Sequence, residues 1–201
     1  MNKLTLALLA SAAALAIAPA AMATTFTYTT SGLFEPSGTS AVTFGSVGNT
    51  STLTYDAGSG TLIGTPSFTS GGSIVTTATG LGANVSGTFA LTITQTAPGP
   101  GSGIIDSGTL SGLVTTNSSG VSVVFANTTL DLDGVFYTVD PLTVNLVAPN
   151  TNTGAGLGTS DIVLYVTTPE PSSLMLLGTG LLGLAFVAFR KAKSSGMVLS
   201  M

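Results

Sequence analysis

The chain has 201 residues, which suits one domain with targeting segments at its ends, and only 6% of them are charged. It contains no Cys and no His, so disulfides, thiolate chemistry and imidazole catalysis are excluded. The basic residues are Lys3, Arg190, Lys191 and Lys193, and the lack of cations from residue 4 to residue 189 argues against nucleic-acid binding.

The first 23 residues predict a secretory signal peptide. Lys3 provides a positive n-region, and residues 4–17 form an apolar h-region. Ala21 and Ala23 supply the small-x-small pattern of a signal-peptidase site, so we expect cleavage after Ala23. The apolar run is short for a membrane span, which argues against the alternative of a retained helical anchor.

Residues 24–168 predict an all-β extracytoplasmic domain. Short runs with period-two alternation, rich in Thr, Val, Ile, Phe and Tyr, recur between clusters of Gly, Asn, Asp, Ser and Pro. These runs cover residues 25–29, 41–47, 51–55, 88–96, 121–126, 135–139, 142–147 and 162–167. Their spacing of roughly 8–12 residues predicts an antiparallel β-sandwich or a jelly-roll-like domain.

Alternation along the predicted strands separates apolar from hydroxyl side chains. In the run 88–94, Phe89, Leu91 and Ile93 share one face, and Thr residues occupy the other. We therefore expect sheets with one apolar face towards a core and one hydroxyl-rich face towards solvent.

Asp131 and Asp133, followed by Gly134, are the candidate ligand site of this domain. Alternation along a strand would put both carboxylates on one face, about 7 Å apart, and hard oxygen ligands suit calcium. An EF-type loop needs more ligands and a downstream Glu, and neither follows. The pattern favours a strand end that leads into an Asp-Gly hairpin turn, so we expect no metal site.

No enzymatic activity and no cofactor are expected. A Ser nucleophile needs an activating base, and residues 24–168 contain neither His nor Lys. A glycosidase needs two carboxylates, which Asp131 and Asp133 could supply in number. However, Trp is absent and only four Tyr are present, so the sequence reveals no aromatic platform for a sugar.

The C-terminal region predicts a transmembrane helix over residues 172–189. This uncharged segment would form a helix about 27 Å long, close to the hydrocarbon thickness of about 30 Å. The cations at its end, Arg190, Lys191 and Lys193, are typical of a stop-transfer signal that stays in the cytoplasm. Residues 194–201 would then form a cytoplasmic tail, with the β domain on the opposite side of the membrane.

The triplet Pro169-Glu170-Pro171, the Gly/Leu-rich span after it and the basic cluster together resemble the bacterial PEP-CTERM sorting signal, over residues 169–193. The resemblance implies a Gram-negative host that makes exopolysaccharide. It also implies recognition near the triplet by exosortase, a membrane-embedded cysteine protease-transpeptidase. The same C-terminal motif is also known as an ice-binding protein C-terminal domain, a label that concerns the C-terminal segment alone.

These features favour a non-enzymatic envelope or extracellular-matrix protein that is exported, tethered to the membrane, sorted and associated with exopolysaccharide. Its expected partners are signal peptidase, an exosortase-type enzyme, the lipid bilayer, and either polysaccharide or further copies of the chain. The β domain would lie in the periplasm and then at the cell surface or outside the cell. The alternative hypothesis is a calcium-binding or ice-binding β-sandwich module, with Thr-x-Thr runs as the ice-binding candidates.

Overall fold

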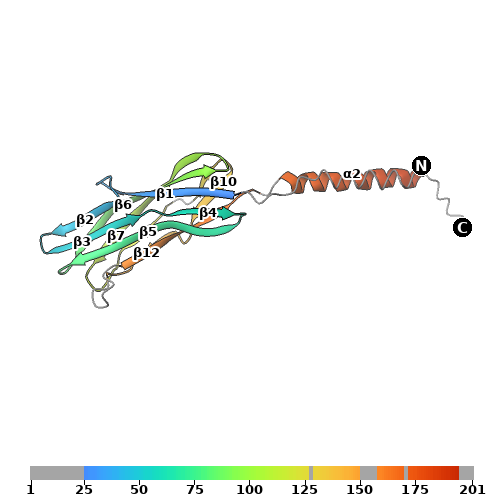
Figure 1. Ribbon diagram of the computed structural model, residues 1–201. Coiled ribbons are helices and arrows are strands. Elements are labelled where there is room, and N and C mark those ends of the chain that lie inside the picture. The colour runs from blue at the N-terminus through green and yellow to red at the C-terminus, as the bar shows by residue number, and fades with distance from the viewer. Residues whose placement is uncertain (1–24, 127–128, 150–157, 170–171, 195–201) are drawn as a thin grey trace, which may run out of the picture. The chain divides into compact units, whose positions relative to one another are not determined.

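The computed structural model describes residues 25–126, 129–149, 158–169 and 172–194 (Figure 1). Thr24–Thr168 form one compact unit that contains the described strands, and the helix α2, Ser172–Ser194, belongs to a second unit. Within the described residues no helix precedes α2, as the sequence predicts.

The described strands of the domain follow one another along the chain. They are β1 (Thr25–Glu35), β2 (Ala41–Ser46), β3 (Asn49–Asp56), β4 (Ser59–Ile63), β5 (Ser67–Thr79), β6 (Ala83–Ala97), β7 (Gly101–Val114), β8 (Ser122–Val124), β9 (Thr129–Leu132), β10 (Val135–Val139), β11 (Thr143–Asn145) and β12 (Gly158–Thr167). Each run that alternation predicts overlaps one of these strands, and the run over residues 135–139 coincides with β10.

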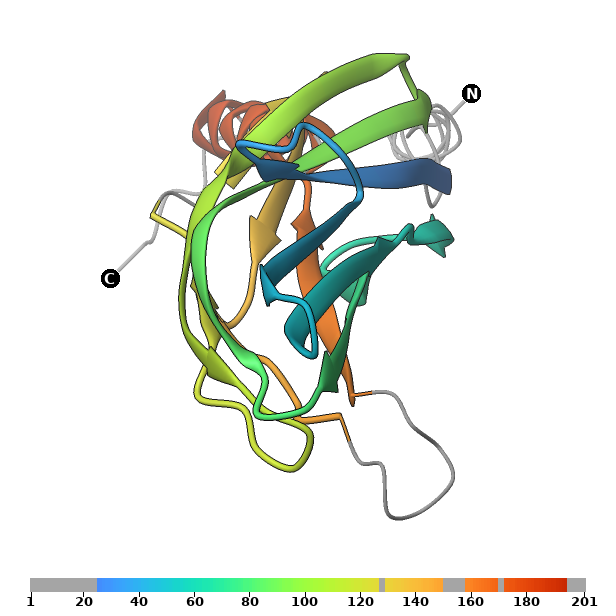
Figure 2. The same ribbon diagram turned by 90° about the vertical axis from the view of Figure 1, so that its left-hand side faces the viewer.

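The strands form two six-stranded sheets in which all neighbours are antiparallel. Sheet I has the order β11-β8-β7-β6-β1-β4, and sheet II has the order β2-β3-β5-β12-β10-β9. Seen end-on, both sheets curl around a common interior (Figure 2). The domain is therefore an antiparallel β-sandwich, the first of the two predicted architectures.

Four strands lie in segments where the sequence gives a weak signal. β5 and β7 are rich in Gly and Ser, and β4 and β9 are only 5 and 4 residues long. Gly carries no side chain and therefore interrupts a pattern of alternating apolar residues. These strands form because the neighbouring strands of each sheet pair with them along their whole length.

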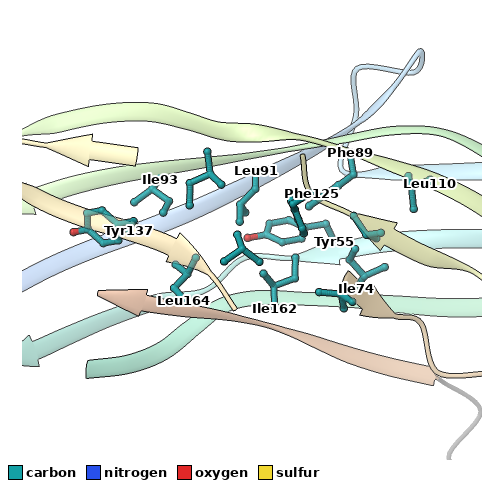
Figure 3. Packing of buried hydrophobic residues seen from close by; sticks show 14 of the residues in the cluster. Tyr55, Ile74, Phe89, Leu91, Ile93, Leu110, Phe125, Tyr137, Ile162 and Leu164 are labelled. Atoms are coloured by element: carbon teal, nitrogen blue, oxygen red, sulfur yellow. The ribbon is translucent and has the colours of Figure 1, made fainter. Parts of the chain in front are cut away.

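The core consists of apolar side chains from the inward faces of both sheets (Figure 3). Phe89 of β6 lies at its centre, with ring centroids 5.0 Å from Phe34 and 5.3 Å from Tyr55, which belongs to the opposite sheet. Gly32 of β1 makes room for this group, because a Cβ there would lie 2.5 Å from the Phe89 ring and 2.7 Å from the Tyr55 ring. All members of the core lie between Phe26 and Val166, so the domain has its own complete core.

A β-bulge in β5 decides which side chains of this strand face outward. Ile74 faces the core, so strict alternation would also direct Phe68 inward. The pairing of β5 with β12 shifts register between Asp161 and Val163, where Gly71 and Gly72 are both buried. Beyond this extra residue the faces exchange, and Phe68 points to solvent with 62% of its surface exposed.

We expect Phe89→Ala to lower the free energy of unfolding by about 3–5 kcal/mol, because a buried aromatic side chain leaves a cavity when it is truncated. Ile104→Ala on the neighbouring strand β7 is the matched control, since Ile104 is 60% exposed, and its effect should stay within about 0.5 kcal/mol. Urea unfolding followed by circular dichroism measures both. Equal losses for the two variants would contradict this description of the core.

Candidate functional site

The sorting segment begins where the sandwich ends. β12 finishes at Thr167, and the Oγ1 atoms of Thr168 and Thr65 lie at hydrogen-bond distance and hold the chain end to the domain. Pro169 follows and is exposed. Of the predicted sorting motif, Glu170 and Pro171 lie outside the described residues. The contact at Thr168 therefore attaches the chain to the domain one residue before the triplet begins.

The helix α2 follows the motif and extends further than predicted. Instead of ending at residue 189 it continues to Ser194, so it includes Arg190, Lys191 and Lys193. Arg and Lys are good helix formers, and positive charge is favourable near a helix C-terminus, which explains the longer helix. Arg190 is exposed, as are the apolar residues from Leu177 to Val187.

In the part of the chain that the structure describes, no helix combines the length and the apolar character that crossing a membrane requires. The transmembrane helix predicted over residues 172–189 is not found there. The predicted signal peptide 1–23, with Ala21 and Ala23, lies outside the described residues and stays a prediction. The tail predicted over residues 194–201 also stays a prediction, since only Ser194, the last residue of α2, is described.

Asp131 and Asp133 do not share one strand face. β9 ends at Leu132, so Asp133 and Gly134 form the two-residue turn to β10, with φ angles of 53° and 77°. Asp131 Oδ1 accepts a hydrogen bond of 2.9 Å from the Gly134 backbone N–H. The hairpin interpretation is therefore confirmed, and the prediction that both carboxylates lie on one strand face is wrong because Asp133 lies in a turn.

The surface of the described residues carries six exposed carboxylates, those of Glu35, Asp56, Asp131, Asp133, Asp140 and Asp161. Among those residues, no group of three or more Asp or Glu side chains is close enough together to hold a metal ion. The calcium hypothesis therefore has no supporting contact in the described part of the domain.

Buried polar side chains connect the two sheets. Gln95 of sheet I, only 1% exposed, donates through Nε2 to the carbonyl of Gly99 at 2.8 Å and accepts at Oε1 from the Tyr137 hydroxyl of sheet II at 2.8 Å. The Tyr28 hydroxyl donates to the Ser70 carbonyl across the sandwich at 2.8 Å. These side chains are thus occupied in holding the sandwich together.

Burial controls the ionisation of the core tyrosines. It raises the pKa of Tyr137 to about 12, with a smaller contribution from the nearby Tyr28. Burial also raises the pKa values of Tyr28 and Tyr55, although hydrogen bonds to Thr69 and Thr30 respectively oppose these increases. None of the three hydroxyls is a candidate proton donor or acceptor for a substrate, because each is buried and engaged in the core.

The outer faces of both sheets carry hydroxyl side chains, as alternation predicts. On sheet II the Oγ1 atoms of Thr43 and Thr52 lie 2.9 Å apart, and those of Thr50 and Thr79 lie 2.8 Å apart. These threonines bond to each other across neighbouring strands, and the register also places Thr77 of β5 opposite Thr52 of β3. The ice-binding alternative stays a prediction, because hydroxyl groups in such positions also suit other partners.

Three aromatic side chains interrupt this hydroxyl surface on sheet II, and we call them the aromatic strip: Phe68 of β5, Tyr165 of β12 and Phe136 of β10. Phe68 and Tyr165 are opposite each other, with ring centroids 4.8 Å apart at an angle of 40°. Phe136 is the diagonal neighbour of Tyr165, because it pairs with Thr167, and both are half-buried. The sequence alone does not reveal this group, although alternation in the run 162–167 already places Tyr165 on the face opposite the core-facing residues.

Comparison with known proteins identifies the C-terminal segment. Residues 167–191 match the family model of the PEP-CTERM protein-sorting motif, so the resemblance seen in the sequence is confirmed. The chain thus carries a signal that implies an exported protein sorted by an exosortase. No curated protein and no solved structure matches the chain.

We expect Gly134→Ala to destabilise the domain by about 1–2 kcal/mol, because Ala at a φ of 77° is strained even though no atom lies within 4 Å of the added Cβ. Gly120→Ala is the control. Its new Cβ would meet only the Leu113 carbonyl oxygen, at 3.9 Å, which is an ordinary van der Waals contact, and its φ is not positive. The change should therefore be small. Thermal unfolding of both variants measures the difference, and equal midpoints would contradict the turn at Asp133-Gly134.

The domain should lose stability as the pH rises from about 10 to about 12. A tyrosine in the unfolded chain ionises near pH 10, whereas the Tyr137 pKa is about 12 in the folded domain. The folded state therefore keeps a proton that the unfolded state releases, and the stabilisation present below pH 10 disappears through this range. Urea midpoints measured against pH test this, and Tyr137→Phe should flatten the decline. A decline of unchanged steepness in the variant would rule out Tyr137 as its source.

Proposed function

We propose that this protein is a non-enzymatic component of the cell envelope or extracellular matrix, sorted by an exosortase-type enzyme and associated with exopolysaccharide. The observation that carries the proposal is the PEP-CTERM motif at residues 167–191. The same motif supports the route: export by the N-terminal signal peptide, retention at the membrane by the C-terminal segment, and recognition near Pro169, Glu170 and Pro171.

The position of the motif supports processing without damage to the domain. All members of the core lie at or before Val166, and a hydrogen bond joins Thr65 to Thr168 just after β12. Pro169 is exposed directly after this contact. An enzyme could therefore reach the triplet that begins at Pro169 while the sandwich stays folded.

The chemistry of the domain supports a binding or structural role. Residues 24–168 contain no His, Cys, Lys or Arg, so a hydroxyl nucleophile there has no conventional activating base. Asp131 bonds to its own turn, and the buried tyrosines hold the two sheets together. What the described surface offers to a partner is mainly hydroxyl groups, interrupted on sheet II by the aromatic strip.

That surface suits polysaccharide. Thr side chains on the outer faces can donate and accept hydrogen bonds, as sugar hydroxyls do. The acidic residues of the domain give it a net negative charge without any cation, which disfavours nucleic acid and anionic lipid as partners. Low charge density also permits self-association, which is the second way in which such a domain could build a matrix.

Deletion of residues 169–201 should release the domain from the membrane fraction into the soluble exported fraction, because the sorting motif and α2 are removed. The matched control replaces Pro169, Glu170 and Pro171 by Ala. It should remain with the membrane and accumulate unprocessed, since only the recognition triplet is lost. Fractionation and immunoblotting of both variants against the natural chain give the comparison.

Unchanged membrane retention of the deletion variant would refute the role of the C-terminal segment. Association with the matrix is measured separately, by a pull-down of the domain 24–168 with the exopolysaccharide of its own host. Failure to bind there would leave the sorting route standing and remove polysaccharide from the proposal.

A further inference from the structure

The aromatic strip is unusual for its position on an otherwise hydroxyl-rich sheet. Phe68 is 62% exposed, whereas other Phe residues of the domain, such as Phe34 and Phe89, are buried in the core between the two sheets. Its ring lies against Tyr165 at a centroid distance of 4.8 Å instead of against the core. An aromatic pair held on the outside of a sheet costs hydrophobic free energy that burial would have recovered.

The bulge at Gly71 and Gly72 creates this arrangement. It exchanges the faces of β5, so that Thr69 points inward to the Tyr28 hydroxyl and Phe68 points outward. The bulge is fixed from the core, because Tyr55 donates a hydrogen bond of 2.7 Å to the Gly71 carbonyl. Bulges commonly re-aim a side chain beside a functional site, and this one re-aims Phe68.

The strip crosses three adjacent strands of sheet II. Because neighbouring strands are about 4.8 Å apart, the rings on β5 and β10 are separated by about 10 Å across the sheet. Phe136 is displaced from Tyr165 by two residues along the strand, which makes the strip run diagonally. The result is a diagonal apolar track long enough for more than one sugar ring.

Polar side chains border this track. Thr138 pairs with Tyr165, and its Oγ1 atom lies 3.3 Å from the Oγ1 atom of Thr129. Thr167 and Asp131 pair with Phe136 from its two sides, and Asp131 is exposed. An extended ligand on the rings would therefore meet hydroxyl groups and a carboxylate at its edges.

We propose that the aromatic strip is a binding face for a neutral polysaccharide. The C–H faces of the sugar rings would pack on Phe68, Tyr165 and Phe136, while sugar hydroxyls bond to the bordering Thr and Asp side chains. This inference rests on the proposed function and adds the site and the chemical class of the glycan. The class follows from charge, because an anionic polysaccharide would face Asp131 with no cation in residues 24–168 to compensate.

A second copy of the chain fits the strip less well. A stable protein interface covers about 800 Å² on each partner and has an apolar centre. Each aromatic side chain can bury at most about 150–250 Å², and two of these three are already half-buried in the sheet. The track is thus too small and its border too polar for a stable dimer, whereas a narrow extended glycan matches its shape.

The test compares the domain 24–168 with two variants in affinity electrophoresis. The domain can be studied alone, because its core and the hydrogen bonds between its sheets lie within these residues. The site variant combines Phe68→Ser and Tyr165→Thr. The control variant combines Leu33→Thr and Ile104→Thr, which removes exposed apolar side chains from the outer face of sheet I instead. Circular dichroism and thermal midpoints first establish that both variants fold.

The gels contain hydroxyethyl cellulose or dextran as neutral probes and alginate as the anionic probe. We expect a neutral probe to retard the natural domain and the control, and the site variant to bind about tenfold more weakly. Alginate should retard none of them. Equal retardation of the natural domain and the site variant would overturn the strip as the site while leaving the proposed function intact.

Two other outcomes would also overturn the inference. The first is retardation by alginate alone, or by no probe. The second is a natural domain that sediments as a dimer and a site variant that sediments as a monomer, which would assign the strip to self-association. The pull-down with host exopolysaccharide decides the proposed function independently, because it uses the natural domain and requires no knowledge of the site.

Discussion

The domain depends on one constraint, which is that it has no cationic side chain with which to pair a buried polar group. Each buried polar atom must find a neutral hydrogen-bond partner, since an unpaired one would cost free energy. Within the described residues every buried side-chain nitrogen and oxygen has such a partner. Several of these partners lie in the opposite sheet, as with Tyr28 and Gln95. Several of the hydrogen bonds that pair the buried polar groups therefore also connect the two sheets.

The two faces of each sheet therefore have different roles. The inner faces use Tyr, Gln and Ser as connectors between apolar side chains, and their hydroxyl and amide groups are fully occupied. The outer faces keep Thr and Ser hydroxyls at the surface, where they can exchange water for other partners. The β-bulge in β5 connects the inner face of sheet II with its outer face. A hydrogen bond from the Tyr55 hydroxyl to the Gly71 carbonyl fixes this bulge, and the bulge directs Phe68 outward.

The sequence predicts the local features of this domain and misses the features that need distant residues. β10 is predicted with its observed ends, Val135 and Val139, and the Asp133-Gly134 turn follows from its own dipeptide. β5 and β7 are missed because their Gly and Ser residues carry little alternation, and only pairing with neighbours defines them. The bulge exchanges the faces of β5 without any signal other than two glycines. For that reason the sequence does not reveal that Phe68 and Tyr165, far apart in the chain, form one surface.

The hydrogen bond between Thr65 and Thr168 has a consequence for the life of the protein after export. It attaches the chain to the sandwich one residue ahead of Pro169, and all members of the core lie before that point, between Phe26 and Val166. Removal of the segment from Pro169 onwards would therefore take no side chain out of the core. Processing at the sorting motif would change the location of the domain and leave its packing unaltered.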